Sequence, residues 1–160
     1  MKKDNAKTNA MRILDALDIE YTMHRYEWDE DHLDAIHAAA SAGLDPEIVY
    51  KTIVMKNSDN LLFVFCLPAQ FEISRKKAKE ITGSRDIELL KTSELKNATG
   101  YIRGGCSPLG MKHKLPTFIE ELALLEERIC VSAGERGMFL ELRPEDLRRA
   151  AEAEFAGFTI

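Results

Sequence analysis

The sequence has few cysteines and no long hydrophobic run. Cys66, Cys106 and Cys130 are far apart and form no CxxC pair, and the four histidines show no metal-ligand spacing. We therefore expect neither a disulfide framework nor a metal site. No apolar run approaches the ~20 residues that span a bilayer, and residues 1–14 lack the apolar core of a secretory signal. These absences predict a cytoplasmic protein with reduced thiols and no membrane partner.

The chain also lacks an excess of positive charge. Its formal net charge is −5, from 22 basic and 27 acidic residues, which argues against non-specific coating of nucleic acid. The basic residues gather at 74–80 (SRKKAKE) and 110–114 (GMKHK). By their number of charges, both clusters fit an ordinary solvated surface better than a local contact with the end of an RNA, which stays the alternative.

The size and patterning of the chain predict one domain over residues 1–160, because no repeat or low-complexity linker divides it. Helical and strand patterns follow one another without strict alternation. This order is typical of an α+β fold with a mixed, partly barrel-like β-sheet surrounded by helices. We predict helices at 8–17, 32–43, 74–83, 92–100 and 143–155, and strands at 19–28, 49–56, 61–68, 86–90, 128–134, 137–143 and 155–160.

Lys51 is the first candidate functional residue. In a strand over 49–56 it shares one face with Val49, Ile53 and Met55 and interrupts an apolar row. Lysine is seldom buried without a partner, and a partly desolvated ammonium is suited to bind an anion or to polarise a carbonyl. A lysine that extends past the strand end, or that pairs with a carboxylate, explains the same pattern.

The segment RGGCSPLGMKHK, residues 103–114, is the second candidate. Gly104 and Gly105 free the backbone to bring amide groups close to a ligand, as in an anion-binding nest or an oxyanion hole, and Ser107 adds a hydroxyl. A tight turn needs the same residues. The segment therefore suggests a binding loop without establishing one.

A similar segment, VSAGERG, follows at 131–137 and contains Ser132 and Gly134. An ordinary hairpin loop explains it equally well. Cys106 is a tempting nucleophile, but no neighbouring base is visible to lower its pKa, so packing is the better interpretation. No Ser-His-Asp or Cys-His arrangement can be read from the spacing.

Three segments in one order resemble the YbaK family of aminoacyl-tRNA deacylases: VYKTIVM, GYIRGGCSPLGMKHKLP and ICVSAGERGMFLEL. The opening AMRILDALDIEYTMHRYEWDE, with its HxY, is also similar, so the resemblance covers nearly the whole chain from about Asn9. It implies the mixed, barrel-like fold that this family shares with the editing domain of bacterial prolyl-tRNA synthetases. It also implies cleavage, without a cofactor, of the ester that joins a wrong amino acid to tRNA.

The resemblance implies roles for individual residues. Lys51 corresponds to the family's essential lysine, positioned at the terminal adenosine phosphate or the aminoacyl ester. The glycine-rich loop would cradle the substrate, the second loop would hold the aminoacyl group, and an aromatic residue would edge the pocket. The other residues implied for this site are Gly104, Gly105, Ser107, Ser132, Gly134, Thr52 and Tyr26.

Two positions depart from the family pattern. Glu135 stands where a basic residue is expected in SAGKRG, and we expect it to weaken the contact with RNA phosphates. Trp28 stands where a histidine is common, and we expect it to change the rim of the pocket.

The absence of a protein nucleophile fits the implied reaction. The thiol of a Cys-tRNA can attack its own ester, so the protein needs only to position the ester and stabilise the oxyanion. We expect cysteine from Cys-tRNA(Pro) as the substrate, with prolyl-tRNA synthetase as a candidate partner. The choice among Cys, Ala and Ser stays open, because a methylene is worth only about 1–3 kcal/mol. The sequence also leaves open the tRNA specificity and the oligomeric state. Two alternative functions remain: a non-catalytic binding module, and a thiol enzyme that uses Cys106.

Overall fold

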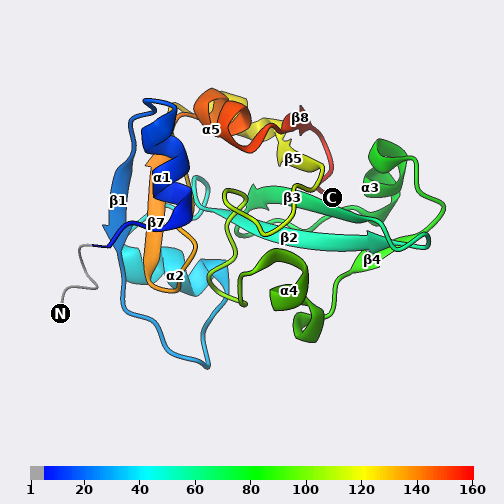
Figure 1. The fold of residues 1–160 in the computed structure, drawn as a ribbon, viewed down its shortest axis with the longest axis horizontal. Helices are drawn as coiled ribbons and strands as arrows, with labels where there is room; N and C mark the ends of the chain where they lie inside the picture. Colours follow the sequence, from blue (N-terminus) through cyan, green and yellow to red (C-terminus); the bar gives the residue numbers. More distant parts are fainter. Residues whose placement is uncertain (1–5) are drawn as a thin grey trace.

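The computed structural model describes residues 6–160 (Figure 1). The prediction that residues 1–14 are not a secretory signal therefore falls partly outside the described residues. Five α-helices of eight residues, one 3₁₀ helix and eight strands make up this part of the chain. The helices are α1 (Asn9–Ala16), α2 (Ala35–Ala42), α3 (Arg75–Thr82), α4 (Thr92–Thr99), α5 (Pro144–Ala151) and the 3₁₀ helix η2 (Glu121–Leu125). The strands are β1 (Thr22–Arg25), β2 (Tyr50–Asn57), β3 (Leu62–Pro68), β4 (Ile87–Leu89), β5 (Thr117–Glu120), β6 (Ile129–Ser132), β7 (Met138–Leu142) and β8 (Glu154–Ala156).

The strands form two sheets. The larger has the order β4-β2-β3-β5-β8 and the smaller the order β1-β7-β6. The smaller sheet is antiparallel, whereas the larger combines antiparallel pairs with the parallel pairs β3–β5 and β5–β8. Figure 1 shows the long β2–β3 hairpin crossing the molecule, with β1, β7 and α2 toward one end and α3 and β4 at the other.

The predicted α+β fold with a mixed β-sheet and surrounding helices is confirmed, and the structure adds how the strands are divided. No closed barrel exists within residues 6–160, and the strands divide between two sheets. The sheets meet at a single bridge, where Val49 pairs with Cys130 and the Cys130 amide donates to the Ile48 carbonyl at 2.7 Å. The division arises because β7 pairs with β6 in a local hairpin and with the N-terminal β1. The β1–β7 pairing is long-range, and local patterning does not reveal it.

Two parts of the chain differ from the predicted elements. Residues 117–125 had no assignment, yet they form β5 and η2, whose four and five residues are too short to show a clear period. The terminal helix was predicted to reach residue 155, but it ends at Ala151. Glu152 adopts a left-handed conformation (φ 53°) there, and the chain turns into β8 beside β5.

The predicted turn between the two central strands is confirmed. The Asn57 side-chain oxygen accepts hydrogen bonds from the amides of Asp59 and Leu61, at 3.0 and 2.9 Å. Asn60 takes a left-handed conformation (φ 65°), which asparagine tolerates better than most residues. The turn fixes the register of β2 against β3, and with it the position of every β2 side chain.

Three groups of buried side chains hold these elements together. The largest joins α1 to β3, β5 and one face of the smaller sheet, and a second packs the other face of the larger sheet under α3. In the third, Ala38 and Ala39 of α2 pack on Cys130 and Phe139, so α2 covers the outer face of the smaller sheet. Within residues 6–160 no helix has the length and apolar character needed to cross a membrane.

Candidate functional site

A cavity of about 360 Å³ opens beside the first residues of β2. Its walls come from β2, the loop at 103–106, the smaller sheet and the segment 33–38 that leads into α2. Pockets of this size commonly bind small molecules. The predicted site residues that line the cavity are Tyr26, Lys51, Thr52, Gly104 and Ser132, and those that do not are Gly105, Ser107 and Gly134.

Lys51 reaches the cavity from the second position of β2. The side chain is partly buried, and desolvation lowers the pKa of its ammonium, while the negative charges of Glu72 and Asp34 act in the opposite direction. Within residues 6–160 the ammonium makes no hydrogen bond or ion pair. The cavity therefore holds a partly desolvated cation that no carboxylate neutralises directly, an arrangement suited to bind an anionic group.

The loop at 103–106 adds main-chain donors to the same cavity. Gly104 and Cys106 both line it, and neither amide has a hydrogen-bond acceptor among the described residues. The intervening Gly105 amide is occupied, since it donates to the Ile102 carbonyl at 2.9 Å. Gly104 has φ 88°, a backbone conformation that residues with a side chain disfavour, so the turn itself requires glycine at this position.

Ser107 does not reach the cavity. It is fully buried, and its hydroxyl accepts a hydrogen bond from the Leu109 amide at 3.2 Å. Ser132 makes the same local turn, accepting from the Gly134 amide at 3.1 Å, but it remains partly exposed and lines the cavity. A serine hydroxyl that bonds the backbone two residues ahead is a common turn device. Of the two predicted serines, only Ser132 lines the cavity.

The remaining glycines bring protein segments together. A Cβ on Gly105 would lie 3.0 Å from the Arg136 amide nitrogen and 3.1 Å from the Glu135 backbone. A Cβ on Gly134 would lie 3.1 Å from the Tyr101 ring. The two glycine-containing loops therefore pack directly against each other, and Gly105 and Gly134 shape the cavity from behind its surface.

Arg136 joins the two loops to the rim of the site. Its Nε donates to the Arg103 carbonyl at 2.9 Å, and its guanidinium lies over the Trp28 ring, 5.1 Å from the centroid. Its side chain also reaches Glu30, with 3.7 Å between the charged atoms. Trp28, one of the two departures from the family pattern, thus supports the arginine that holds the Arg103–Gly104 turn. Glu135, the other, is exposed.

Cys106 lines the cavity as a protonated thiol. Burial raises the pKa of its thiol to about 12, although a hydrogen bond with Thr99 opposes the shift. Cys66 lies close by, 3.9 Å from the Thr52 hydroxyl, and burial raises its pKa to about 12 as well. Reactive cysteines need a depressed pKa. The environment therefore disfavours nucleophilic catalysis by Cys106.

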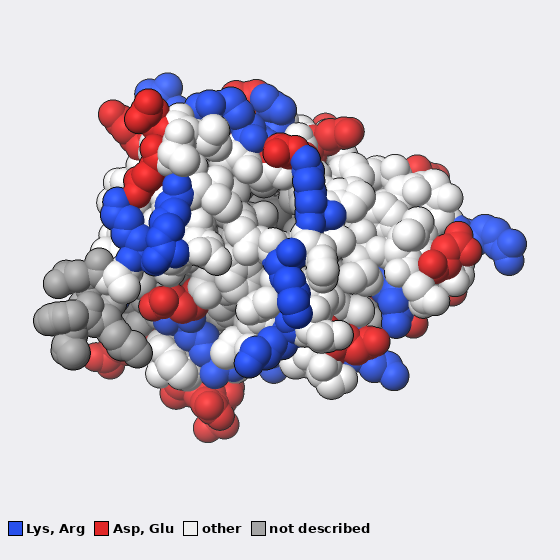
Figure 2. Space-filling view, in the orientation of Figure 1, with Lys and Arg blue, Asp and Glu red and all other residues white. Residues whose placement is uncertain are grey.

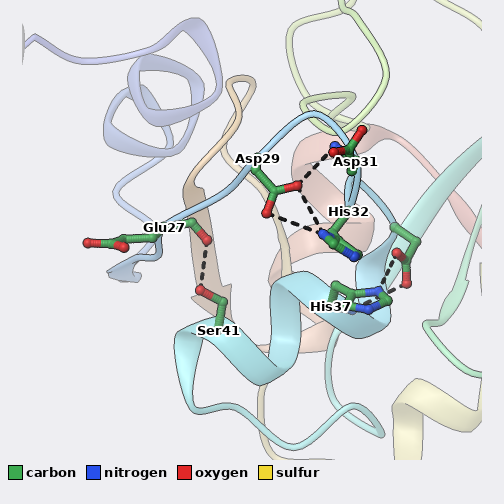
Figure 3. Close-up of polar contacts among 7 residues, drawn as sticks. Glu27, Asp29, Asp31, His32, His37 and Ser41 are labelled. Carbon is green, nitrogen blue, oxygen red and sulfur yellow. Dashed lines mark hydrogen bonds and ion pairs between the residues drawn. The ribbon is translucent and has the colours of Figure 1, made fainter.

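The segment before α2 forms another wall of the cavity and is held by paired carboxylates and imidazoles (Figure 3). Asp34 caps α2 by accepting from the His37 amide at 3.2 Å, and it also bonds the His37 ring at 2.6 Å. Asp29 bonds the His32 ring at 3.0 Å and accepts from the Asp31 amide. The two rings lie 4.6 Å apart. These contacts fix the position of residues 33–36 against the cavity.

Sequence reasoning missed three charged residues that line the cavity. Arg103 precedes the two glycines, Asp34 is the helix cap, and Glu72 follows β3 in a short loop. Arg103 could have been identified from its place beside the glycines. Nothing local distinguishes Asp34 or Glu72 from the many other acidic residues, and only the tertiary fold brings them to Lys51.

Charges of both signs are mixed on the face shown in Figure 2, with wide uncharged areas between them. In the predicted basic clusters, the Lys77 ammonium donates to the Thr159 carbonyl, Lys112 to the Asn97 carbonyl, and Lys114 pairs with Glu152. These contacts are those of a solvated surface. A local RNA contact by these lysines stays a prediction.

Comparisons with known proteins agree with this geometry. The family model of the aminoacyl-tRNA editing domain matches residues 29–150. EbsC of Enterococcus faecalis, an inferred Cys-tRNA(Pro)/Cys-tRNA(Cys) deacylase, is 39% identical over 158 residues, covering 99% of this chain and 96% of EbsC. YwhH of Bacillus subtilis is 20% identical over 121 residues, 76% of each chain.

Solved structures share the fold. The protein APE2540 superimposes with a TM-score of 0.86 at 18% identity, covering 96% of this chain and 100% of its own. An inferred trans-editing enzyme for prolyl-tRNA synthetase superimposes with a TM-score of 0.78 at 19% identity, covering 98% of this chain and 99% of its own. At these identities the likeness establishes the fold, while the family model and EbsC establish kinship. The chain belongs to the aminoacyl-tRNA editing domain family.

Proposed function

We propose that this protein is an aminoacyl-tRNA deacylase that removes a mischarged amino acid, with cysteine on tRNA(Pro) as the preferred substrate. One observation carries the proposal. The partly buried Lys51 ammonium, which no carboxylate pairs, shares a cavity with the unbonded amides of Gly104 and Cys106. Membership of the editing family, and the inferred activity of EbsC, support the same conclusion. We further propose that the 160 residues act as one editing domain.

Lys51 lies where two hollows meet. Besides the cavity, a second hollow of about 470 Å³ lies along β2 and β4, and Lys51, Ile53 and Glu72 line both. In our proposal the aminoacyl group enters the cavity and the terminal nucleotide lies in the second hollow. The ammonium then stands beside the ester and its neighbouring phosphate, where a fixed cation stabilises negative charge best.

The proposed reaction needs no protein nucleophile. The substrate thiol attacks its own carbonyl carbon, a sulfur–carbon bond forms, and the bond to the ribose oxygen breaks. The thiol proton passes to that oxygen, so atoms and charge balance. The chain positions the ester and donates hydrogen bonds to the developing oxyanion, from Lys51 and from the amides of Gly104 and Cys106. The hydroxyls of Thr52 and Ser132 line the space left for the amino acid.

The substrate implies the setting. Aminoacyl-tRNA is made and used in the cytoplasm, so we place the protein there. We propose prolyl-tRNA synthetase as the partner that supplies tRNA(Pro), because a structural neighbour is named as a trans-editing enzyme for that synthetase. The mixed surface charge favours such delivery over tight independent tRNA binding.

A deacylation assay tests the proposal. The protein is mixed with Cys-tRNA(Pro), Ala-tRNA(Pro) and Pro-tRNA(Pro), and ester loss is followed over time. We expect loss of Cys-tRNA(Pro) alone, and a decrease on the order of 100-fold or more in Lys51→Ala, as for removal of an oxyanion donor. Lys56→Ala, on the same strand, is the matched control and should keep full activity.

Other outcomes are equally informative. Faster loss of Ala-tRNA(Pro) would move the preferred substrate to alanine and require an activated water. Retained tRNA binding with no turnover of any ester would replace the deacylase with a binding module.

A further inference from the structure

His24, Cys130 and Glu141 gather on the outer face of the smaller sheet, and none of them is among the residues assigned to the reaction. One ligand atom from each, the imidazole nitrogen, the sulfur and a carboxylate oxygen, all lie within 4.8 Å of one another. The His24 Nε2 and the Glu141 carboxylate are 2.6 Å apart. His24 is the first residue of the HxY in the opening segment, and the proposed reaction gives this histidine no role.

The three residues are fixed by strand pairing. Cys130 of β6 stands opposite Glu141 of β7, and His24 of β1 stands opposite Phe139, two residues from Glu141 on the same face. Side chains on neighbouring strands at these positions approach closely and move little relative to one another. The ligand atoms are therefore held together before any ion arrives.

We propose that His24, Cys130 and Glu141 form a binding site for Zn²⁺. Imidazole, thiolate and carboxylate are the ligands that zinc prefers, at about 2.0–2.3 Å from the ion. Donor atoms separated by less than 4.8 Å need only small rotations of the side chains to reach those distances. The side chains of His24 and Glu141 are 27% and 22% exposed, so an ion can enter from solvent and keep a water as its fourth ligand.

Binding changes the protonation of the site in a defined way. The Cys130 thiol forms a sulfur–zinc bond and releases its proton to solvent. His24 binds as the neutral ring through Nε2, so its proton resides on Nδ1. The Glu141 carboxylate exchanges its hydrogen bond with His24 for coordination to the ion.

The site lies next to one wall of the cavity, on the same sheet. Tyr26, Ser132 and Phe139 line the cavity, and each lies two residues along the chain from one of the proposed ligands. Because side chains two residues apart in a strand share a face, a bound ion would tie β1, β6 and β7 together beside these residues. Zinc would therefore stabilise this wall without contacting the substrate.

Cobalt provides the first test, because Co²⁺ bound by a thiolate gives a charge-transfer absorption band in the near ultraviolet. We expect the purified reduced protein to bind one Co²⁺ per chain with this band, and Zn²⁺ to displace it. Cys130→Ala should abolish the band. Cys66→Ala, which removes another fully buried cysteine, should retain it.

His24→Gln is the second variant, and it still tests the zinc site if Cys130→Ala fails to fold. His24 is partly exposed, so the substitution is mild, and the Co²⁺ affinity should fall by more than 10-fold. His37→Gln controls for weak binding at the exposed His32–His37 pair and should leave the band unchanged.

A wild-type protein without a thiolate band, or a band that survives Cys130→Ala, overturns the proposal and leaves His24–Glu141 as a hydrogen-bonded pair. These measurements do not involve deacylation, so the zinc site and the proposed reaction stand or fall separately.

Discussion

The two ends of strand β2 use the same residue type in opposite ways. Lys51, at the start, is partly buried at a cavity and makes no ion pair among the described residues. Lys56, near the end, lies 3.4 Å from the Glu94 carboxylate. The first ammonium is held where it is less stable than in water, and the second where a neighbour compensates its charge. The difference indicates which lysine is available for a ligand.

The first and largest prediction compares two loops. One is the loop at 103–106, which lies beside the start of β2 across the cavity, and the other is the turn that follows the end of β2. Gly104→Ala places a Cβ 3.1 Å from the Leu33 side chain at φ 88°, and should destabilise the fold by about 1–2 kcal/mol. Because the Gly104 and Cys106 amides shift with it, kcat/KM for Cys-tRNA(Pro) should fall by about 10- to 100-fold. Deacylation rates and urea unfolding measure the two effects.

Asn57→Ala is the matched control at the other end. The substitution removes the oxygen that accepts hydrogen bonds from the Asp59 and Leu61 amides. The free energy of unfolding should therefore fall by a similar amount, about 1–2 kcal/mol, because each hydrogen bond contributes about 1 kcal/mol. Its kcat/KM should be unchanged at a temperature where both variants are folded. Equal activity losses in the two variants would mean that the Gly104 effect is only one of stability.

The second prediction concerns the lysines themselves. Lys51→Met removes a partly desolvated charge and keeps the length of the side chain, so the free energy of unfolding should rise by about 1 kcal/mol while activity is lost. Lys56→Met breaks a partly exposed ion pair and should lower the free energy of unfolding by about 0.5 kcal/mol or less. Urea denaturation at neutral pH distinguishes the signs. A destabilised Lys51→Met would show that Lys51 has a structural role.

The larger elements were predictable because their patterns are long. The apolar row around Lys51 and the NSDN turn predicted β2, β3 and their hairpin, and Gly43 and Gly83 end α2 and α3 as left-handed C-caps. Where elements are four or five residues long, as in β5 and η2, no period can be recognised. The two-sheet arrangement depends on contacts between the first and last thirds of the chain, which local patterns do not contain.

The candidate site was predictable only in part, for a physical reason. A glycine pattern indicates that backbones approach closely, but not whether the neighbour is a ligand or the protein. Gly104 lines the cavity, whereas Gly105 packs on the 135–136 backbone. A serine beside them serves a turn as readily as a substrate, as Ser107 does. Likewise, the proposed zinc ligands lie at positions 24, 130 and 141, a spacing that no linear motif expresses.

The third and smallest prediction follows the Lys51 charge across pH. Burial lowers the pKa of Lys51 below its usual 10.5, so between its folded pKa and 10.5 the unfolded chain binds more protons than the folded one. Stability attributable to this residue therefore rises with pH through that window, and the charge is most destabilising at pH values below it. The stability gap between Lys51→Met and the wild type should be widest at neutral pH and should close as the pH approaches 10.5.

Urea unfolding of both proteins at matched pH values measures this gap. The buried tyrosines, Tyr50 and Tyr101, also have raised pKa values, but they are present in both proteins and cancel in the difference. A Lys51 gap that stays constant with pH would mean that the ammonium is no less stable in the folded protein than in water. The contrast between the two ends of β2 would then be one of position and not of charge.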